Sequence, residues 1–480
     1  MGRTWDENAY VEYGYKFLQL VKKGDFTNDY WYKTSDEPPL VRYIYAIPSY
    51  FDVDHLLPNG NVKFKYDYTY SRIVSAIASS VSVIFVVLVG WELLSPFIGI
   101  IAGIIFSMLP FYLGLSQLAT LESFIMLFFT SSIYFFLKFL RRFSLKFLIL
   151  SGISIGLALQ TKYTNILLIP LIICLYYIWY LNKGKRKSNI FEIKIVYIFL
   201  ISLFVFFILW PMPWFHLKEV IEFNYKWRIL GSRYSVPEVF FGKLMLTPVI
   251  YYVIYFLITT PFLILTLFLA GIKKVDENKK WISYTILAWF ILPFIQSFYN
   301  FRQHGVRYII EIYAPLSLLA AIGFDSIVSR LTKKIWLKFV YFIPIFIYMI
   351  MILFRITPYY LDYFNEVVGG TKNVYEKELF QLGWWGQGMR EAGIYIKENA
   401  ASGSQVAVVG ENSFSVMPSI NNVSITKYQE GRKYDYIIVS YFQIIREGFN
   451  DEKIKNSCSP VYSVLADGAN LVWIYKIKNH

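Results

Sequence analysis

Ten long apolar stretches alternate with short polar segments between residues 72 and 355. Each stretch is close to the ~20 residues that a helix needs to cross the hydrocarbon core of a bilayer. This alternation predicts an α-helical polytopic membrane protein with about ten spans. We expect the spans at residues 72–93, 97–115, 118–138, 145–160, 162–181, 193–213, 246–270, 281–299, 308–328 and 335–355.

The first 70 residues contain no spanning run but include two amphipathic pieces, at residues 8–23 and 39–51. The first piece carries four apolar side chains on one helical face: Tyr10, Tyr13, Phe17 and Leu20. Half-apolar helices rich in aromatic residues lie in the membrane interface more readily than they cross it. We therefore expect two interfacial helices, joined by a rigid turn at Pro38 and Pro39.

After residue 356 the pattern changes to short β-rich runs bounded by Gly, Asn and Asp. These runs lie at residues 405–410, 434–440, 461–465 and 471–477, and a helix is predicted over 389–399. The chain is thus expected to divide into an outer segment at 1–70, a transmembrane domain at 71–356 and a small soluble α/β domain at 357–480.

The composition agrees with a membrane protein, because 56% of the 480 residues are hydrophobic and the mean hydropathy is +0.44. A net charge of +14 could suggest nucleic acid. Lys and Arg crowd the cytoplasmic loops of membrane proteins, however, and this explains the excess without a nucleic-acid partner. The two cysteines, Cys174 and Cys458, predict neither a disulfide framework nor a thiolate metal site.

Basic residues cluster in alternate loops, near 138–146, 183–187, 273–280 and 330–338. With ten spans these four loops share one side, which should be cytoplasmic. The outer segment, the residues around 160–162, the loop 214–245, the residues 300–307 and the C-terminal domain then face outward. An outward amino terminus without a preceding span is unusual. Either the chain begins with its amino terminus outside, or its start codon was placed after a lost first helix, and we favour the second. The Lys, Ile, Tyr and Asn richness suggests an AT-rich prokaryote, either a bacterium or an archaeon, so we expect the protein in a prokaryotic plasma membrane.

Two adjacent carboxylates, Asp6 and Glu7, stand near the start of this apolar chain. A carboxylate that deprotonates an acceptor hydroxyl is what glycosyl transfer with inversion requires. The same pair could instead cap a helix and complement its dipole. A third acid, Glu122, lies near the outer end of an apolar span, where it is either functional or an interfacial side chain.

Cations on the expected outer side are candidate phosphate ligands. Lys162 is either such a ligand or an interfacial anchor. Arg302, His304 and Arg307 form the densest outward basic cluster, against the positive-inside trend, and guanidinium groups match phosphate oxygens well. No second metal ligand stands at the right spacing beside His304, so no metal site or cofactor is predicted, and dependence on a divalent metal stays open.

Two further regions have no assigned chemistry. The loop 214–245, which contains Arg233, is either a mobile lid or an interfacial helix. The glycine-containing segments 363–370 and 383–387 are interpreted as tight turns with aromatic packing, because glycine supplies backbone freedom there.

In their order along the chain, these features resemble the GT-C superfamily of polyprenyl-phosphate-sugar-dependent glycosyltransferases. The nearest branches are the protein O-mannosyltransferases and the bacterial aminoarabinose transferases of lipid A. The resemblance is carried by Asp6 and Glu7, Pro38 to Leu40, Glu122, the segment 157–163, Arg307 and Tyr308 before Pro315, the segment 358–370, and Trp385 to Gln387.

The resemblance implies an inverting enzyme that moves a sugar, mannose or a similar hexose or pentose, from a polyprenyl-phosphate donor to a protein, lipid or glycan acceptor. Asp6 would be the catalytic base, Glu7 a positioning partner, and Glu122 a residue that shapes the acceptor pocket or supports the base. The donor phosphate would be held by Lys162, Arg307, Tyr308 and Arg302.

Glu37, His304 and Arg233 are candidate substrate contacts in the same interpretation. The chain departs from the family pattern at two points. A spanning helix normally precedes the acidic pair, and the residue before Pro38 is often His or Lys where this chain has Glu37.

Two other function classes compete with a transferase. A transporter or flippase of lipid-linked sugars would show polar residues at mid-membrane and related half-repeats, and neither is evident in the sequence. A binding protein that used the membrane part only as an anchor would not need ten spans.

Overall fold

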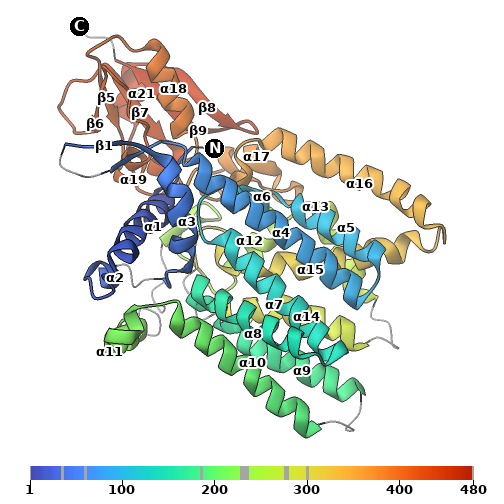
Figure 1. Ribbon diagram of the computed structural model, residues 1–480. Coiled ribbons are helices and arrows are strands. Elements are labelled where there is room, and N and C mark those ends of the chain that lie inside the picture. The colour runs from blue at the N-terminus through green and yellow to red at the C-terminus, as the bar shows by residue number, and fades with distance from the viewer. Residues whose placement is uncertain are drawn as a thin grey trace.

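The computed structural model describes residues 2–33, 37–58, 62–183, 188–226, 237–274, 280–298 and 302–477. Long helices form a bundle, and the N-terminal helices and the C-terminal sheet gather at one end of it (Figure 1). Most of the chain is helical, and the small sheet predicted at the C-terminal end is present. The division of the chain at residues 70 and 356 stays a prediction.

Both amphipathic helices of the N-terminal segment are confirmed. Helix α1 (Trp5–Lys23) begins at a capping box made by Thr4 and Glu7, and it ends where Gly24 adopts a left-handed φ of 65°. A short α2 (Tyr30–Lys33) precedes α3 (Leu40–Asp52). Helices α1 and α3 cross closely at Gly14, where a Cβ atom would lie 2.4 Å from the carbonyl oxygen of Arg42.

Each of the ten predicted apolar stretches coincides with a helix or a helix pair. Within the described residues, five helical segments are long and apolar enough to cross a membrane, and the number rises to eight if each of three bent pairs is one span. The five are α4 (Thr69–Leu93), α7 (Glu122–Arg142), η1 with α9 (Tyr163–Leu167 and Leu168–Lys183), η5 with α15 (Arg307–Ile312 and Tyr313–Val328) and α16 (Ile335–Ile356).

Three predicted spans are bent rather than straight. The pairs are α5 with α6 (Pro96–Ser107 and Pro110–Ser116), α10 with α11 (Ser188–Ile208 and Met212–Asn224) and α12 with α13 (Tyr251–Thr259 and Phe262–Lys273), bent by 70°, 100° and 114°. A proline stands at each break: Pro110, Pro211 and Pro261. Proline lacks the amide hydrogen and clashes with the preceding turn, so an apolar run can continue where the helix cannot.

Two more predicted spans, α8 (Leu145–Thr161) and α14 (Lys280–Ser297), are apolar but shorter.

Two of the predicted spans were placed too early at their amino-terminal ends. The stretch expected from residue 118 becomes helical only at Glu122, and the one expected from 246 becomes helical only at Tyr251, after a strand. Glu122 therefore lies in the first turn of the spanning-length helix α7.

The C-terminal domain contains a five-stranded sheet in the order β6-β5-β7-β9-β8. Strands β5 (Gln405–Val408), β6 (Ser424–Lys427) and β7 (Tyr436–Ser440) are parallel, whereas β8 (Pro460–Ala466) and β9 (Ala469–Lys476) are antiparallel. The predicted strands appear as β5, β7, β8 and β9, and α18 (Met389–Asn399) is the predicted helix. The sequence patterns missed β6, the helices α17, α19, α20 and α21 (Gly370–Glu376, Glu411–Ser415, Tyr441–Ile445 and Glu452–Ser457), and η6 and η7 (Tyr360–Asp362 and Glu366–Val368).

Two small hairpins were also missed. They are β1 with β2 (Val53–Leu56 and Val62–Phe64) and β3 with β4 (Pro237–Phe240 and Lys243–Leu246). Strands of three or four residues are too short to show the alternation on which strand prediction depends.

Candidate active site

Three charged side chains from distant parts of the chain meet at one point. The Arg307 guanidinium donates from Nη1 to Asp6 Oδ2 at 2.7 Å and from Nε to Glu122 Oε1 at 2.5 Å. The positive charge is thereby shared between two carboxylates. We call this group the Asp6–Arg307–Glu122 cluster.

The local structure explains why these residues can meet. Asp6 and Glu122 lie in the first turns of α1 and α7, where the partial positive charge of a helix amino terminus favours a carboxylate. Arg307 opens η5, and its guanidinium lies 4.2 Å above the ring of Trp385, which comes from the segment before α18. The Trp385 ring covers one face of the guanidinium, and the two carboxylates accept hydrogen bonds from the nitrogen atoms at its edge.

Of the two carboxylates in the cluster, that of Asp6 is partly exposed to solvent and that of Glu122 is buried. The Asp6 side chain is 31% exposed, whereas Glu122 is 1% and Arg307 5% exposed. A molecule that arrives from solution would therefore meet Asp6, while Glu122 holds Arg307 from behind. This arrangement suits Asp6 for accepting a proton and Glu122 for positioning.

Glu7 is in a different environment from its neighbour. It is fully buried, and Arg72 donates to its two oxygens at 2.7 Å each, while the backbone amides of Ala119 and Thr4 donate at 2.8 and 2.9 Å. Burial raises the pKa of Glu7, but the charge and hydrogen bonds of Arg72 and the amide donors outweigh it and hold the pKa below its usual value. With its oxygens occupied in this way, Glu7 joins elements instead of facing substrate.

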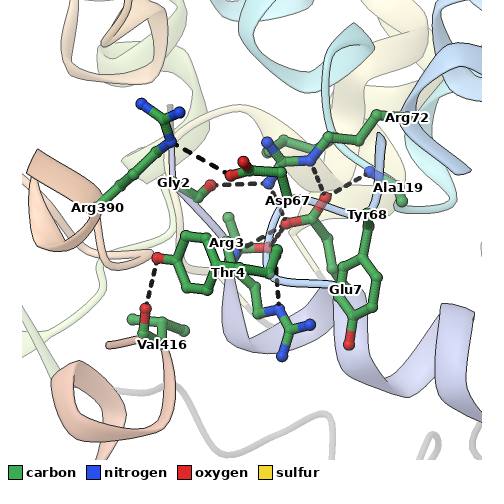
Figure 2. A network of polar contacts seen from close by, with 12 residues as sticks. Gly2, Arg3, Thr4, Glu7, Asp67, Tyr68, Arg72, Ala119, Arg390 and Val416 are labelled. Carbon is green, nitrogen blue, oxygen red and sulfur yellow. Dashed lines mark hydrogen bonds and ion pairs between the residues drawn. The ribbon is translucent and has the colours of Figure 1, made fainter. Parts of the chain in front are cut away.

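Figure 2 shows how far this network reaches. Arg72 also donates to the carbonyl oxygen of Gly2 at 2.8 Å, and Asp67 forms an ion pair with Arg390 of the C-terminal domain at 3.3 Å. Glu7 and its neighbours thus attach the start of α1 to α4, to the loop before α7 and, through Asp67, to the C-terminal domain.

Lys162 lies on the side of the cluster formed by α8 and η5. Its ammonium is 4.3 Å from the ring centroid of Tyr308, and it interacts electrostatically with Glu122 and Glu311. Among the described residues, Lys162 has no carboxylate within ion-pair distance. The structure therefore brings Lys162, Arg307 and Tyr308 together, and it leaves the ammonium of Lys162 able to take an anionic ligand.

Tyr10 and Glu37 extend the cluster. Burial raises the pKa of the Tyr10 phenol well above its usual value, and the nearby charges of Asp6, Glu122 and Glu37 raise it further against the effect of Arg307. Tyr10 consequently stays protonated and can donate a hydrogen bond. Sequence reasoning placed Tyr10 only on an apolar helix face.

The loop that presents Arg307 is fixed by a buried acid. Glu238 on β3 accepts the backbone N–H of His304 at 2.9 Å and the hydroxyl of Tyr251 at 2.5 Å, and that hydroxyl accepts the N–H of Gly305 at 3.0 Å. His304 and Gly305 both have left-handed φ values, 57° and 61°, so the turn needs such support. Burial raises the pKa of Glu238 to about 7.

The side chains of the remaining predicted residues lie apart from the cluster. The His304 ring stacks on Trp384 at 4.4 Å, and burial with the charges of Arg307 and Arg446 holds its pKa well below the usual value, so it is neutral. Arg302 donates to the carbonyl oxygens of Thr247 and Phe298. Arg233 lies outside the described residues.

Four contributors were missed as site residues: Tyr10, Arg72, Glu238 and Trp385. Trp385 was seen but interpreted as turn packing. Within the part of the chain that the structure describes, no three His, Cys, Asp or Glu side chains are grouped to hold a metal ion.

Residues 13–225 match the family described as dolichyl-phosphate-mannose-protein mannosyltransferase. A search among curated proteins finds no sequence match. Among solved structures, ArnT from Cupriavidus metallidurans in the apo state aligns with a TM-score of 0.49 at 13% identity, over 98% of this chain and 93% of that chain.

Two further alignments are with larger proteins. The archaeal oligosaccharyltransferase AglB from Archaeoglobus fulgidus, in complex with an inhibitory peptide and a dolichol-phosphate, aligns with a TM-score of 0.47 at 11% identity, over 92% of this chain and 66% of that chain. The S. cerevisiae protein O-mannosyltransferase complex bound to the sugar donor aligns with a TM-score of 0.34 at 19% identity, over 46% of this chain and 31% of that chain. The chain is thus similar, over residues 13–225, to a family of mannosyltransferases that use a dolichyl-phosphate-linked sugar.

Proposed function

We propose that this enzyme transfers a sugar, with inversion, from a polyprenyl-phosphate donor to an acceptor hydroxyl, with Asp6 as the general base. The observation that carries the proposal is the unequal exposure within the Asp6–Arg307–Glu122 cluster. A base must reach the acceptor proton within hydrogen-bond distance, and Asp6 is the carboxylate of the cluster that an acceptor can reach.

In the proposed reaction, the acceptor hydroxyl donates its proton to the Asp6 carboxylate while its oxygen attacks C1 of the sugar. The bond between C1 and the phosphate oxygen breaks, and its electron pair leaves with the polyprenyl phosphate. Lys162 and Arg307 stabilise the negative charge that develops on this leaving group. Glu122 keeps the Arg307 guanidinium in place, because it binds Nε from a fully buried position.

The donor class is supported by the matched family, whose description contains dolichyl-phosphate-mannose. Mannose is thus the first sugar to test, and a protein hydroxyl the first acceptor. We place the reaction on the outer face of a prokaryotic plasma membrane, because the basic loops mark the opposite side as cytoplasmic.

The decisive experiment measures release of radiolabelled sugar from a polyprenyl-phosphate pool by the purified protein, with Asp6→Asn beside the wild type. Loss of a general base should lower the rate roughly 10²- to 10⁴-fold. Asp54→Asn is a matched control, because Asp54 is an exposed acid of the N-terminal segment that pairs only with His55 among the described residues. It should leave the rate unchanged.

Equal turnover by Asp6→Asn and the wild type would remove Asp6 as the base. Donor binding by the wild type without any release of sugar would instead favour a transporter or binding protein for lipid-linked sugars.

A further inference from the structure

The C-terminal sheet changes direction between two of its parallel strands. Strand β5 is followed by β6 on one side, and the chain then crosses over to place β7 on the other side of β5. In open sheets with parallel strands, ligands bind outside the carboxyl ends of the strands at such a reversal. The proposed transfer reaction makes no use of this place in the fold.

A cleft of about 580 Å³ lies at this place. Residues that follow all three parallel strands line it: Gly410 after β5, Tyr428 and Glu430 after β6, and Gln443, Phe449 and Lys453 after β7. Its volume is within the range of small-molecule sites. The sheet topology and the cavity therefore indicate the same position independently.

The cleft is built around a glycine and an amide. Gly410 has a φ of 83°, and a Cβ atom there would lie 2.1 Å from Oε1 of Gln443, so only glycine lets the amide approach this closely. Gln443 is itself buried, with 4% exposure. The half-buried rings of Tyr428 and Phe449, also on the lining, meet edge to face with centroids 5.6 Å apart.

The charges on the lining are compensated. Lys453 forms an ion pair with Glu430 at 2.6 Å, and Glu447, also on the lining, lies 3.7 Å from Arg446. Because each carboxylate is paired with a cation, the lining carries no excess positive charge that would attract a phosphate group. An aromatic face combined with amide and carboxylate groups suits a ligand that presents both C–H surface and neutral hydroxyl groups.

We propose that this cleft binds a neutral saccharide. Helix α20, which supplies Gln443, also supplies Phe442, and the Phe442 ring lies 6.3 Å from the ring of Trp5, the residue before Asp6. The saccharide is therefore held one short helix away from the element that carries the catalytic base. A role for this saccharide as part of the acceptor rests on the proposed function, but the binding itself does not.

The test is isothermal titration calorimetry with the full-length protein in detergent. The probes are neutral disaccharides of glucose, mannose, galactose and N-acetylglucosamine, with mannose 1-phosphate as the anionic comparison. We expect saturable binding of at least one neutral disaccharide, with affinity reduced roughly fivefold or more in Tyr428→Ala and in Gln443→Met. Tyr428→Phe should retain most of the affinity, because it keeps the ring.

Two controls separate this site from the rest of the molecule. Tyr462→Ala removes an exposed aromatic side chain from β8 of the same domain, outside the cleft lining, and should bind as the wild type does. Asp6→Asn should also bind normally, so failure of the proposed transfer reaction would not be confused with failure of this site.

Three results would overturn the proposal. They are no saturable binding of any neutral probe up to about 10 mM, tighter binding of mannose 1-phosphate than of the neutral probes, and equal affinities of Tyr428→Ala and the wild type.

Discussion

Asp6 and Glu7 are neighbours in the sequence and opposites in the structure. Successive residues on a helix point about 100° apart, so one carboxylate of the pair turns toward Arg307 and the solvent while the other turns inward to Arg72. The sequence presents two equivalent acids because the residues that distinguish them are far away along the chain. The two acids differ in role because their partners differ: Asp6 pairs with Arg307 and Glu7 with Arg72.

Glu7→Gln should therefore affect stability much more than Asp6→Asn does. The change removes the carboxylate that accepts two hydrogen bonds from the buried Arg72 guanidinium, and breaking a buried pair in this way costs about 3–5 kcal/mol. Thermal unfolding in one detergent should show a clearly lower Tm for Glu7→Gln and a Tm near the wild-type value for Asp6→Asn. Equal melting of all three proteins would contradict a structural role for Glu7.

Lys162 provides a second test at the residue scale. If its ammonium binds the donor phosphate, Lys162→Met should raise the KM for the polyprenyl-phosphate sugar about 10- to 100-fold, the range expected for a lost charge-assisted hydrogen bond. Lys162→Arg keeps the charge and should recover part of the loss. Lys372→Met is a control, because Lys372 is an exposed surface lysine of α17. A KM that is unchanged in Lys162→Met would exclude this lysine from the phosphate site.

At the scale of elements, the features that follow from local sequence patterns could be predicted, and those that depend on long-range contacts could not. Apolar runs of spanning length and amphipathic spacing are local, so the membrane helices, α1, α3 and α18 were predicted near their observed bounds. The three helix bends could have been predicted from the prolines at the breaks, but the hydropathy pattern used to predict the spans does not detect them. The short hairpins and the roles of Tyr10, Glu238 and Trp385 depend on partners that no local pattern indicates.

The role of Glu238, on strand β3, can be tested by varying the pH. The pKa of Glu238 is raised by burial to about 7 in the folded protein, above the 4.5 expected when the chain is unfolded. The folded state therefore binds the proton more tightly. This contribution to stability is complete below about pH 4.5 and is lost as the pH rises through about 7.

We expect the Tm of the wild type to fall between pH 5 and pH 8 and the fall to be smaller in Glu238→Gln, whose amide does not titrate. Glu12→Gln, on α1 and away from the Arg307 loop, should keep the wild-type slope. An identical slope in Glu238→Gln and the wild type would contradict the assignment. The measurement is a series of melting curves at fixed ionic strength, because screening changes with salt.

On the scale of the whole molecule, the C-terminal domain is attached to the segment that carries Asp6. Tyr66 donates to the carbonyl oxygen of Val416 at 2.7 Å, Arg390 pairs with Asp67, and Arg355 of α16 pairs with Asp467 at 3.0 Å. The ring centroids of Trp5 and Phe442 lie 6.3 Å apart. The domain thus supports the geometry of α1, and Trp385 of its leading segment covers Arg307 directly.

Removing one of these contacts should reduce catalysis without weakening donor binding. Trp5→Ala takes away the ring between Asp6 and α20 but leaves Lys162 and Arg307 in place, so kcat should fall several-fold while the KM for the donor stays near the wild-type value. Trp336→Ala is the matched control, since Trp336 is 61% exposed near the start of α16. If Trp5→Ala changes KM as much as kcat, or if neither constant differs from those of Trp336→Ala, then the C-terminal domain does not position the proposed base. A selective loss in kcat would mean that a domain outside the membrane part sets the reach of Asp6 toward the acceptor.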